Sequence, residues 1–150
     1  MDFSQIMIAI AAIWGAVLST YTAIRSFSKE KPKIKVKLSY GFLAYGPDLS
    51  PQMLLLEAAN VGRWTVTLSS CGLTLPSRIT PFMTFIKPQS NKEFPCELSP
   101  GKNLLVWMEK SELSENLRSH RFRDTIKIRG VYKDAVGNSY TSKSLKFSIE

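Results

Sequence analysis

The sequence is poor in the residues that most often carry chemistry. Its 150 residues include one histidine, His120, and two cysteines, Cys71 and Cys96. Two cysteines cannot build a disulfide-dense scaffold, and a single histidine excludes the usual two-histidine metal sites and proton relays. Nucleophile-elbow, Walker, dinucleotide-binding and zinc-protease motifs are all missing from the sequence. We therefore expect a protein that is not an enzyme, with no catalytic residues, no metal and no cofactor.

Acidic residues are scarce relative to basic ones. The 20 lysines and arginines outnumber the 12 acidic residues, which gives a formal net charge of +8. The chain is 44% hydrophobic and 21% charged, a balance typical of folded rather than disordered proteins. Its length suits about one domain. The charge excess favours partners that are anionic.

The longest uncharged stretch lies at the N-terminus, over residues 3–24, and residues 6–18 are continuously apolar. A helix of this length reaches about 33 Å, enough to cross a hydrocarbon core of about 30 Å. We predict an uncleaved, single-pass transmembrane helix, a signal anchor, over residues 1–25. A cleaved signal peptide and a buried soluble helix are the alternatives, although no basic residue precedes the apolar stretch.

Basic residues follow this helix closely, whereas only Asp2 precedes it. They are Arg25, Lys29, Lys31, Lys33, Lys35 and Lys37, with Glu30 as the one opposing charge among them. The positive-inside rule therefore predicts an inner (plasma) membrane protein with its N-terminus outside and its C-terminal domain in the cytoplasm. The same cluster is suited to anionic lipid head groups or a partner, unless it serves topology alone. In a reducing compartment the two cysteines are expected to be free thiols.

Small residues recur every fourth position in the predicted membrane helix, at Ala11, Gly15, Ser19 and Ala23. Such a ridge lets helix backbones approach closely and favours self-association in membranes. The alternative is that these residues reflect only the ordinary composition of membrane helices.

After a short tether, residues 26–32, the sequence predicts a soluble, mostly β domain over residues 33–150. Alternating or apolar runs separated by turn residues indicate seven or eight short strands. The expected strands cover residues 33–40, 53–59, 64–75, 82–86, 94–98, 103–108, 125–132 and 140–149, and a short helix over 112–119 is expected to be capped by Ser111. The expected architecture is an antiparallel β-sandwich, immunoglobulin-like in outline, with a small closed barrel as the alternative.

Several side chains are assigned to the core or the surface from these patterns. Leu113 and Leu117 of the helix are expected to face the core. Cys71 and Trp107 are expected to be buried, whereas Cys96 follows Pro95 near an expected sheet edge and is expected to be accessible. Asp134 begins a hairpin loop over 134–138, where its carboxylate is expected to accept hydrogen bonds from backbone amides.

The first candidate ligand site is a cationic run after the short helix. Arg118, His120, Arg121 and Arg123 lie within six residues of one another, with an aromatic ring, Phe122, among them. Guanidinium groups suit phosphate or carboxylate, so this run is a candidate contact for a nucleotide-like anion. The alternative is a solvated helix end whose cations complement the helix dipole.

Two further surfaces are candidates for partner binding. The outward positions of the expected strands are basic, and they would form one electropositive sheet face if those strands pair; these positions are Lys33, Lys35, Lys37, Lys127, Arg129 and Lys146. The pair Arg63 and Trp64 follows a glycine turn and is a candidate interface anchor, with Trp64 in the core as the alternative.

These features predict a membrane-anchored, non-enzymatic interaction module that presents a basic cytoplasmic β-sandwich to a protein partner. Its layout resembles that of small bacterial single-span proteins with a β domain. The alternative is a ligand-gated membrane effector that binds a nucleotide-like anion and oligomerises through its helix, similar in layout to small anti-phage defence proteins. Specific nucleic-acid binding is not expected, because stacking-rich motifs are lacking.

Overall fold

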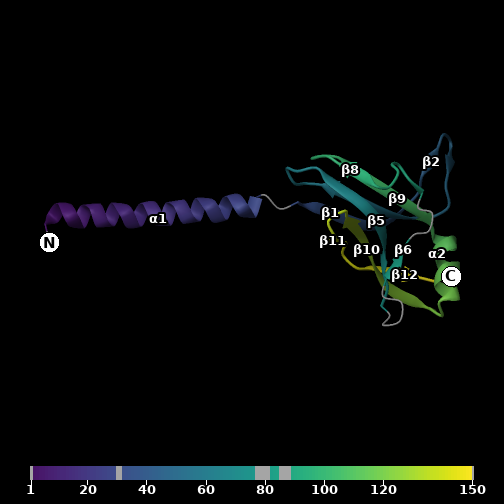
Figure 1. The fold of residues 1–150 in the computed structure, drawn as a ribbon. Helices are drawn as coiled ribbons and strands as arrows, with labels where there is room; N and C mark the ends of the chain where they lie inside the picture. Colours follow the sequence, from purple (N-terminus) through teal and green to yellow (C-terminus); the bar gives the residue numbers. More distant parts are fainter. Residues whose placement is uncertain (1, 30–31, 77–81, 85–88, 150) are drawn as a thin grey trace. The chain divides into compact units, whose positions relative to one another are not determined.

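The computed structural model of the chain describes residues 2–29, 32–76, 82–84 and 89–149 (Figure 1). The chain divides into two compact units, Met1–Lys31 and Pro32–Glu150. The first unit holds one long helix, and the second holds the strands and one short helix.

The first unit is dominated by helix α1 (Phe3–Lys29). Its segment Phe3–Ser26, 24 residues, is long and apolar enough to cross a membrane. The helix includes residues 26–29, which the sequence pattern predicts to be part of the tether. No proline or glycine interrupts the helix there, and it ends shortly before Pro32, whose ring disfavours a helical residue ahead of it.

Threonine hydroxyls inside α1 are satisfied by the helix itself. The hydroxyl of Thr20 donates to the Ala16 carbonyl at 2.8 Å, and that of Thr22 donates to the Leu18 carbonyl at 2.7 Å. A membrane core offers no water to such groups, so these internal bonds suit a helix that spans a bilayer.

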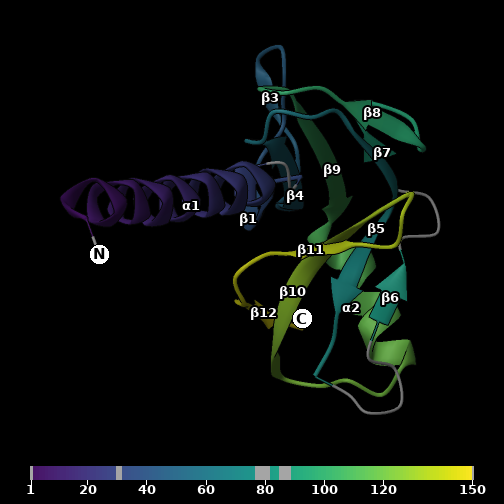
Figure 2. The same ribbon diagram turned by 60° about the vertical axis from the view of Figure 1, so that its left-hand side comes forward.

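The described strands of the second unit form two main antiparallel sheets and a short hairpin (Figure 2). The first sheet has the order β1-β4-β9-β7, with bounds β1 Ile34–Gly41, β4 Met53–Asn60, β9 Asn103–Glu109 and β7 Gln89–Ser90. The second has the order β11-β10-β5-β6, with bounds β11 Ser139–Thr141, β10 Thr125–Asp134, β5 Val66–Thr74 and β6 Phe82–Thr84. Strand β12 (Leu145–Ser148) pairs with β10, β8 (Cys96–Leu98) pairs with β5, and β2 (Ala44–Tyr45) pairs with β3 (Asp48–Leu49). The expected mostly β architecture with two antiparallel sheets is confirmed.

The hydrophobic core draws on both sheets and on helix α2 (Lys110–Ser119). Leu56 of β4 and Tyr132 of β10 are both fully buried, and the Tyr132 hydroxyl donates to the Leu56 carbonyl across the two sheets at 2.7 Å. Leu113 and Leu117 of α2 are fully buried in the same core, as predicted. The core therefore joins the two sheets and fixes α2 at one end of the domain, beside the end of β12 (Figures 1 and 2).

Strand phase was predicted correctly at β1 but not at β9. In β1, Lys35 and Lys37 are exposed while Leu38 is buried. In β9, Val106 is buried and Trp107 is only half-buried, with its indole N–H donating to the Gln89 side-chain oxygen at 2.8 Å. The expectation that Trp107 belongs to the core is wrong. Strand β9 carries apolar residues on both of its faces, and the buried face is the one with Leu104 and Val106.

Two surface assignments are also corrected. Trp64 lies before β5 begins and is 57% exposed, so the core alternative is wrong for this residue. Cys96 is buried, because β8 pairs with β5 and turns this side chain inward.

The ends of several elements differ from those predicted. Helix α2 begins at Lys110 with Glu109 as its N-cap, and Ser111 lies inside the first turn with its hydroxyl bonded to the Glu109 carboxylate at 3.2 Å. The expected last strand is divided into β11 and β12, which both pair with β10. The expected strand over 82–86 is described only over β6, and residues 85 and 86 lie outside the described residues.

Candidate binding surfaces

Nucleophilic and metal-ligating side chains do not gather anywhere in the described part of the chain. No group of three His, Cys, Asp or Glu side chains that could hold a metal ion occurs among those residues. Both cysteines are free and buried, and desolvation raises the pKa of the Cys71 thiol to about 12. That thiol stays protonated at neutral pH, where it is a poor nucleophile. The absence of enzymatic activity stays a prediction.

The cationic run after α2 is shaped by an abrupt reversal of the chain. Arg121 and Asp124 both adopt left-handed backbone conformations, with φ of 66° and 64°. The Arg121 amide bonds to the Arg118 carbonyl at 2.9 Å, and the Phe122 amide bonds to the Leu117 carbonyl at 3.0 Å. These bonds satisfy carbonyls that the end of the helix would otherwise leave open. The reversal therefore fixes where each arginine of the run lies.

Two of the four predicted residues share a pocket. Arg118 and Arg123 line a cavity of about 390 Å³ together with Phe122, Asp124 and Ile149. Two guanidinium groups and one carboxylate give this pocket a formal charge of +1, and the Phe122 ring offers an apolar wall. We name it the arginine pocket.

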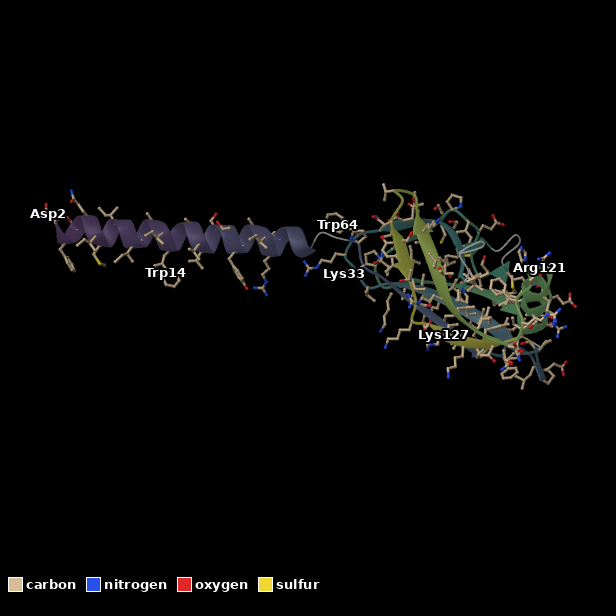
Figure 3. The ribbon with its side chains drawn as sticks, turned by 90° about the horizontal axis from the view of Figure 1, so that it is seen from below. Asp2, Trp14, Lys33, Trp64, Arg121 and Lys127 are labelled. Carbon is tan, nitrogen blue, oxygen red and sulfur yellow. The ribbon has the colours of Figure 1, made fainter. Side chains whose placement is uncertain are left out.

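The other two predicted residues do not line the arginine pocket. The His120 ring is turned back to its helix, with Nδ1 at 2.8 Å from the Asn116 carbonyl. Arg121 is exposed and lies at the end of the domain opposite Lys33 (Figure 3). Asp124 and Ile149 are the pocket residues that sequence reasoning missed. The Ile149 amide bonds to the Asp124 carbonyl at 3.1 Å, a contact between distant positions that no local sequence pattern signals.

The six outward basic positions do not lie on one sheet. Lys35 and Lys37 lie on β1, which pairs with β4 in the first sheet, and Lys37 is directly opposite Glu57. Lys127, Arg129 and Lys146 lie on β10 and β12 of the second sheet. The condition for a single electropositive sheet face, that these strands pair with one another, is not met, because β1 pairs with β4 and β10 pairs with β12.

The three cations of the second sheet form a basic surface of their own, which we name the lateral basic face. Lys127 is directly opposite Lys146 across the β10–β12 pair, and Arg129 is opposite Thr74 across the β10–β5 pair. All three cations are exposed. Lys127 and Arg129 also line a depression of about 300 Å³ with Thr74, Leu75, Pro76 and Ser144. Three exposed cations on neighbouring strands give this face a positive potential.

The remaining residues of the predicted juxtamembrane cluster are distributed over both units. Arg25 and Lys29 belong to α1, and Lys33 directly precedes β1. Lys31 lies outside the described residues. The cluster is therefore continuous in sequence, and the structure does not describe it as one surface.

The small-residue ridge of α1 is exposed along its length, at Ala11, Gly15, Ser19 and Ala23. A side-chain carbon added at Gly15 would meet no described atom within 4 Å.

Arg63 and Trp64 lie in a turn between β4 and β5, and both are exposed. Trp64 lines a depression of about 290 Å³ with Pro32, the first residue of the second unit, and with Ala135 and Val136 of the 134–138 hairpin. Trp64 and Lys33 lie at the same end of the β domain, as Figure 3 shows.

Comparisons with known proteins give only distant structural likenesses. No family model matches the chain, and no curated protein matches it. A structural genomics target solved by X-ray crystallography is 10% identical, with a TM-score of 0.39, over 80% of this chain and 88% of that one. A protein of Bordetella pertussis described as ApaA is 9% identical, with a TM-score of 0.41, over 79% of this chain and 94% of that one. Likenesses this weak do not assign a family or a function to the chain.

Proposed function

We propose that this chain is a single-span membrane protein whose β domain, an immunoglobulin-like sandwich, is a non-enzymatic module that binds an acidic partner protein. The observation that carries the proposal is the lateral basic face, where Lys127 and Lys146 are paired across two strands with Arg129 beside them. An electropositive sheet surface of this kind is suited to a partner with carboxylates at matching positions.

The lateral basic face offers more than charge. A lysine pair in direct register stays mutually repulsive until an anion lies between the two ammonium groups. Arg129 adds a planar guanidinium that can hold a carboxylate with two hydrogen bonds. Hydroxyls of Thr74 and Ser144 line the same depression and can donate to carboxylate oxygens. Together these groups favour an acidic protein segment laid along the sheet.

The proposed location rests on the first unit and on the charges that follow it in the sequence. Helix α1 has a membrane-length apolar segment, Phe3–Ser26, and basic residues follow it closely in sequence. The positive-inside rule then places the β domain on the cytoplasmic side of the inner membrane. A C-terminal reporter fusion that is active only in the cytoplasm tests this orientation, and activity of a periplasmic reporter would contradict it.

The binding proposal is tested with the full-length protein, purified from native membranes in mild detergent. The charge-reversal variant Lys127→Glu with Lys146→Glu is compared with wild type and with Lys92→Glu, an exposed lysine outside this face. We expect a stoichiometric acidic protein to copurify with wild type and with Lys92→Glu, to be released by high salt, and to be lost from the double variant. Retention of the same partner by the double variant would contradict the proposal.

A second candidate function is favoured by the arginine pocket, where Arg118 and Arg123 face one cavity. In that case the chain is an effector that binds a nucleotide-like anion and assembles through the ridge at Gly15. We expect Arg118→Glu with Arg123→Glu to abolish nucleotide binding measured by calorimetry, and Arg121→Glu to retain it, because Arg121 does not line the pocket. Gly15→Ile should then remove nucleotide-dependent oligomerisation. Equal binding by all variants would exclude this function for the pocket.

A further inference from the structure

An apolar surface is exposed at the end of the β domain where the chain enters it. Its largest members are Trp64, Val61 and Val136, which are 57%, 61% and 85% exposed. Trp64 and Val136 line one depression with Pro32, the first residue of this unit. We name the surface formed by Pro32, Val61, Trp64 and Val136 the entry surface.

The turn that carries Trp64 is held firmly by a buried asparagine. Asn60 is 1% exposed, and its side-chain amide donates to the carbonyls of Trp64 and Leu98, both at 2.7 Å. Its side-chain oxygen accepts the Gly62 amide at 2.9 Å. A side-chain carbon at Gly62 would lie 3.0 Å from the Lys33 backbone nitrogen, so the turn is packed against the first residues of the domain. The exposure of Trp64 is therefore a fixed feature of this turn.

The hairpin that carries Val136 is organised in the same way by Asp134. This buried carboxylate accepts the amides of Val136 and Asn138 at 3.1 and 2.8 Å, and the Tyr140 hydroxyl at 2.9 Å. Gly137 supplies the positive φ, 94°, that closes the hairpin. Two independent turns thus place apolar side chains at the same end of the domain without burying them in its core.

Exposed cations accompany the entry surface. Lys33 follows Pro32 directly, Arg63 precedes Trp64, and the Lys102 carbonyl accepts the Asn60 amide at 3.0 Å, so Lys102 is held beside the same turn. All three of these basic residues are exposed. Interfacial membrane surfaces share this composition, with aromatic and aliphatic side chains between lysines and arginines.

We propose that the entry surface docks onto the head-group region of an anionic bilayer, with Trp64 and Val136 inserted at the interface. The inference rests on the proposed membrane anchoring by α1. Pro32 is only three positions after Lys29, the last residue of α1, so the linker in sequence between the proposed anchor and the entry surface is short. Such tethering gives a high effective concentration, and weak lipid contacts then suffice for docking.

A bilayer fits this surface better than a protein partner does. Stable protein interfaces bury about 800 Å² on each side, over about 20 residues or more, whereas the entry surface consists of a few side chains from three short segments. A lipid surface needs no such area, because insertion of an aromatic side chain and attraction of flanking cations act together.

The experiment uses the full-length protein reconstituted into vesicles of phosphatidylcholine, alone or mixed with phosphatidylglycerol. The chain has three tryptophans, Trp14, Trp64 and Trp107. One variant, Trp14→Phe with Trp107→Phe, retains Trp64 only, and a second, Trp64→Phe with Trp107→Phe, retains Trp14 only. Brominated lipids then quench the fluorescence of whichever tryptophan lies in the bilayer.

We expect brominated lipids to quench Trp64 strongly in the mixed vesicles and weakly in phosphatidylcholine alone. Lys33→Glu with Arg63→Glu should lower the ratio of docked to undocked protein by about 30-fold or more, because two attractive cations are lost and become repulsive. Lys92→Glu, at an exposed turn elsewhere in the domain, should leave the quenching unchanged.

Trp14, in the middle of α1, separates the possible failures. Quenching of Trp14 without quenching of Trp64 would overturn the docking inference and leave the membrane anchor intact. Absence of Trp14 quenching would overturn the anchor, and the docking inference with it. Shielding of Trp64 from a water-soluble quencher without lipid quenching would show that a protein or a second copy covers the surface, and this also overturns the inference.

Discussion

A substitution at Gly130 tests the close approach of the two sheets directly. Gly130 lies in β10, and a side-chain carbon added there would clash with Leu56 Cδ1 and lie 3.3 Å from Leu56 Cγ in β4. Leu56 is only 1% exposed, so it has no free space into which to move. The Gly130 amide is itself bonded to the buried Ser142 hydroxyl at 2.9 Å, which keeps the backbone in place. Alanine at position 130 therefore forces the core to rearrange.

The expected cost of Gly130→Ala is about 1–3 kcal/mol, the usual range for overpacking a filled core. Unfolding of the full-length protein in mild detergent, followed by near-ultraviolet circular dichroism in urea, measures this cost. Thr125→Ala is the matched control, since Thr125 is an exposed residue of the same strand. The control should change the free energy of unfolding by no more than about 0.5 kcal/mol.

The double variant Gly130→Ala with Leu56→Ala shows whether the clash is the cause. Leu56→Ala alone should cost about 2–5 kcal/mol, because it leaves a cavity in the core. In the double variant the new methyl group occupies part of that cavity, so the loss should be smaller than the sum of the two single losses by about 1–2 kcal/mol. Strictly additive losses, or an undiminished stability of Gly130→Ala, would refute the packing argument.

Three further predictions concern buried polar groups. Desolvation opposes ionisation of Asp134, but hydrogen bonds from its hairpin outweigh desolvation and lower the pKa of this carboxyl. The ionised carboxylate therefore stabilises the fold above the ordinary carboxyl pKa, and this stabilisation is lost as pH falls through the lowered pKa. Urea unfolding at stepwise lower pH should show wild type losing more stability than Asp134→Asn. Cys71 and Cys96 are buried, and the pKa of the Cys71 thiol is raised to about 12, so a disulfide reagent at neutral pH should label both thiols only after unfolding, and rapid labelling of the native protein would contradict this. Asn60→Ala removes three hydrogen bonds at a buried position, including one to Leu98, and should cost about 2–4 kcal/mol by the same unfolding assay, whereas a loss below about 1 kcal/mol would show that the turn does not depend on them.

Periodicity predicted the strands that bury a single face. Val36 and Leu38 alternate with lysines in β1, so only one register places the apolar residues inside, and the structure adopts it. The run from Leu104 to Trp107 has no such contrast, and a period of two cannot decide which phase the core takes. In the structure Leu104 and Val106 are the buried residues of this run, and both belong to the core cluster.

Trp64 shows a different limit of sequence reasoning. It shares the phase of Val66 and Leu68, and both of those are buried, 6% and 0% exposed. The phase was therefore right, but β5 begins only at Val66, so Trp64 extends beyond the sheet that would have covered it. The position of a strand end depends on tertiary contacts, here those made by Asn60, and local pattern does not contain them.

The arginine run was recognisable from its composition, but its geometry was not. Arg121 adopts a positive φ and does not line the pocket that Arg118 and Arg123 share. Non-glycine residues seldom adopt this conformation, so no propensity would have suggested it. Ile149 completes the pocket through a contact with Asp124 that only the folded chain provides.

The positions of the surfaces within the β domain bear on how the two candidate functions relate. Trp64 and Lys33 lie at one end of the domain, and Arg121, which follows the helix that carries Arg118, lies at the other (Figure 3). If the entry surface docks onto lipid, the end that carries the arginine pocket points away from the bilayer, and a soluble anion can reach it without competition from head groups. Lys127, on the lateral basic face, lies between these ends in the same view. An acidic partner could then bind laterally while both ends are occupied, so that nucleotide binding and partner binding would be separable by charge reversal at Arg123 and at Lys127.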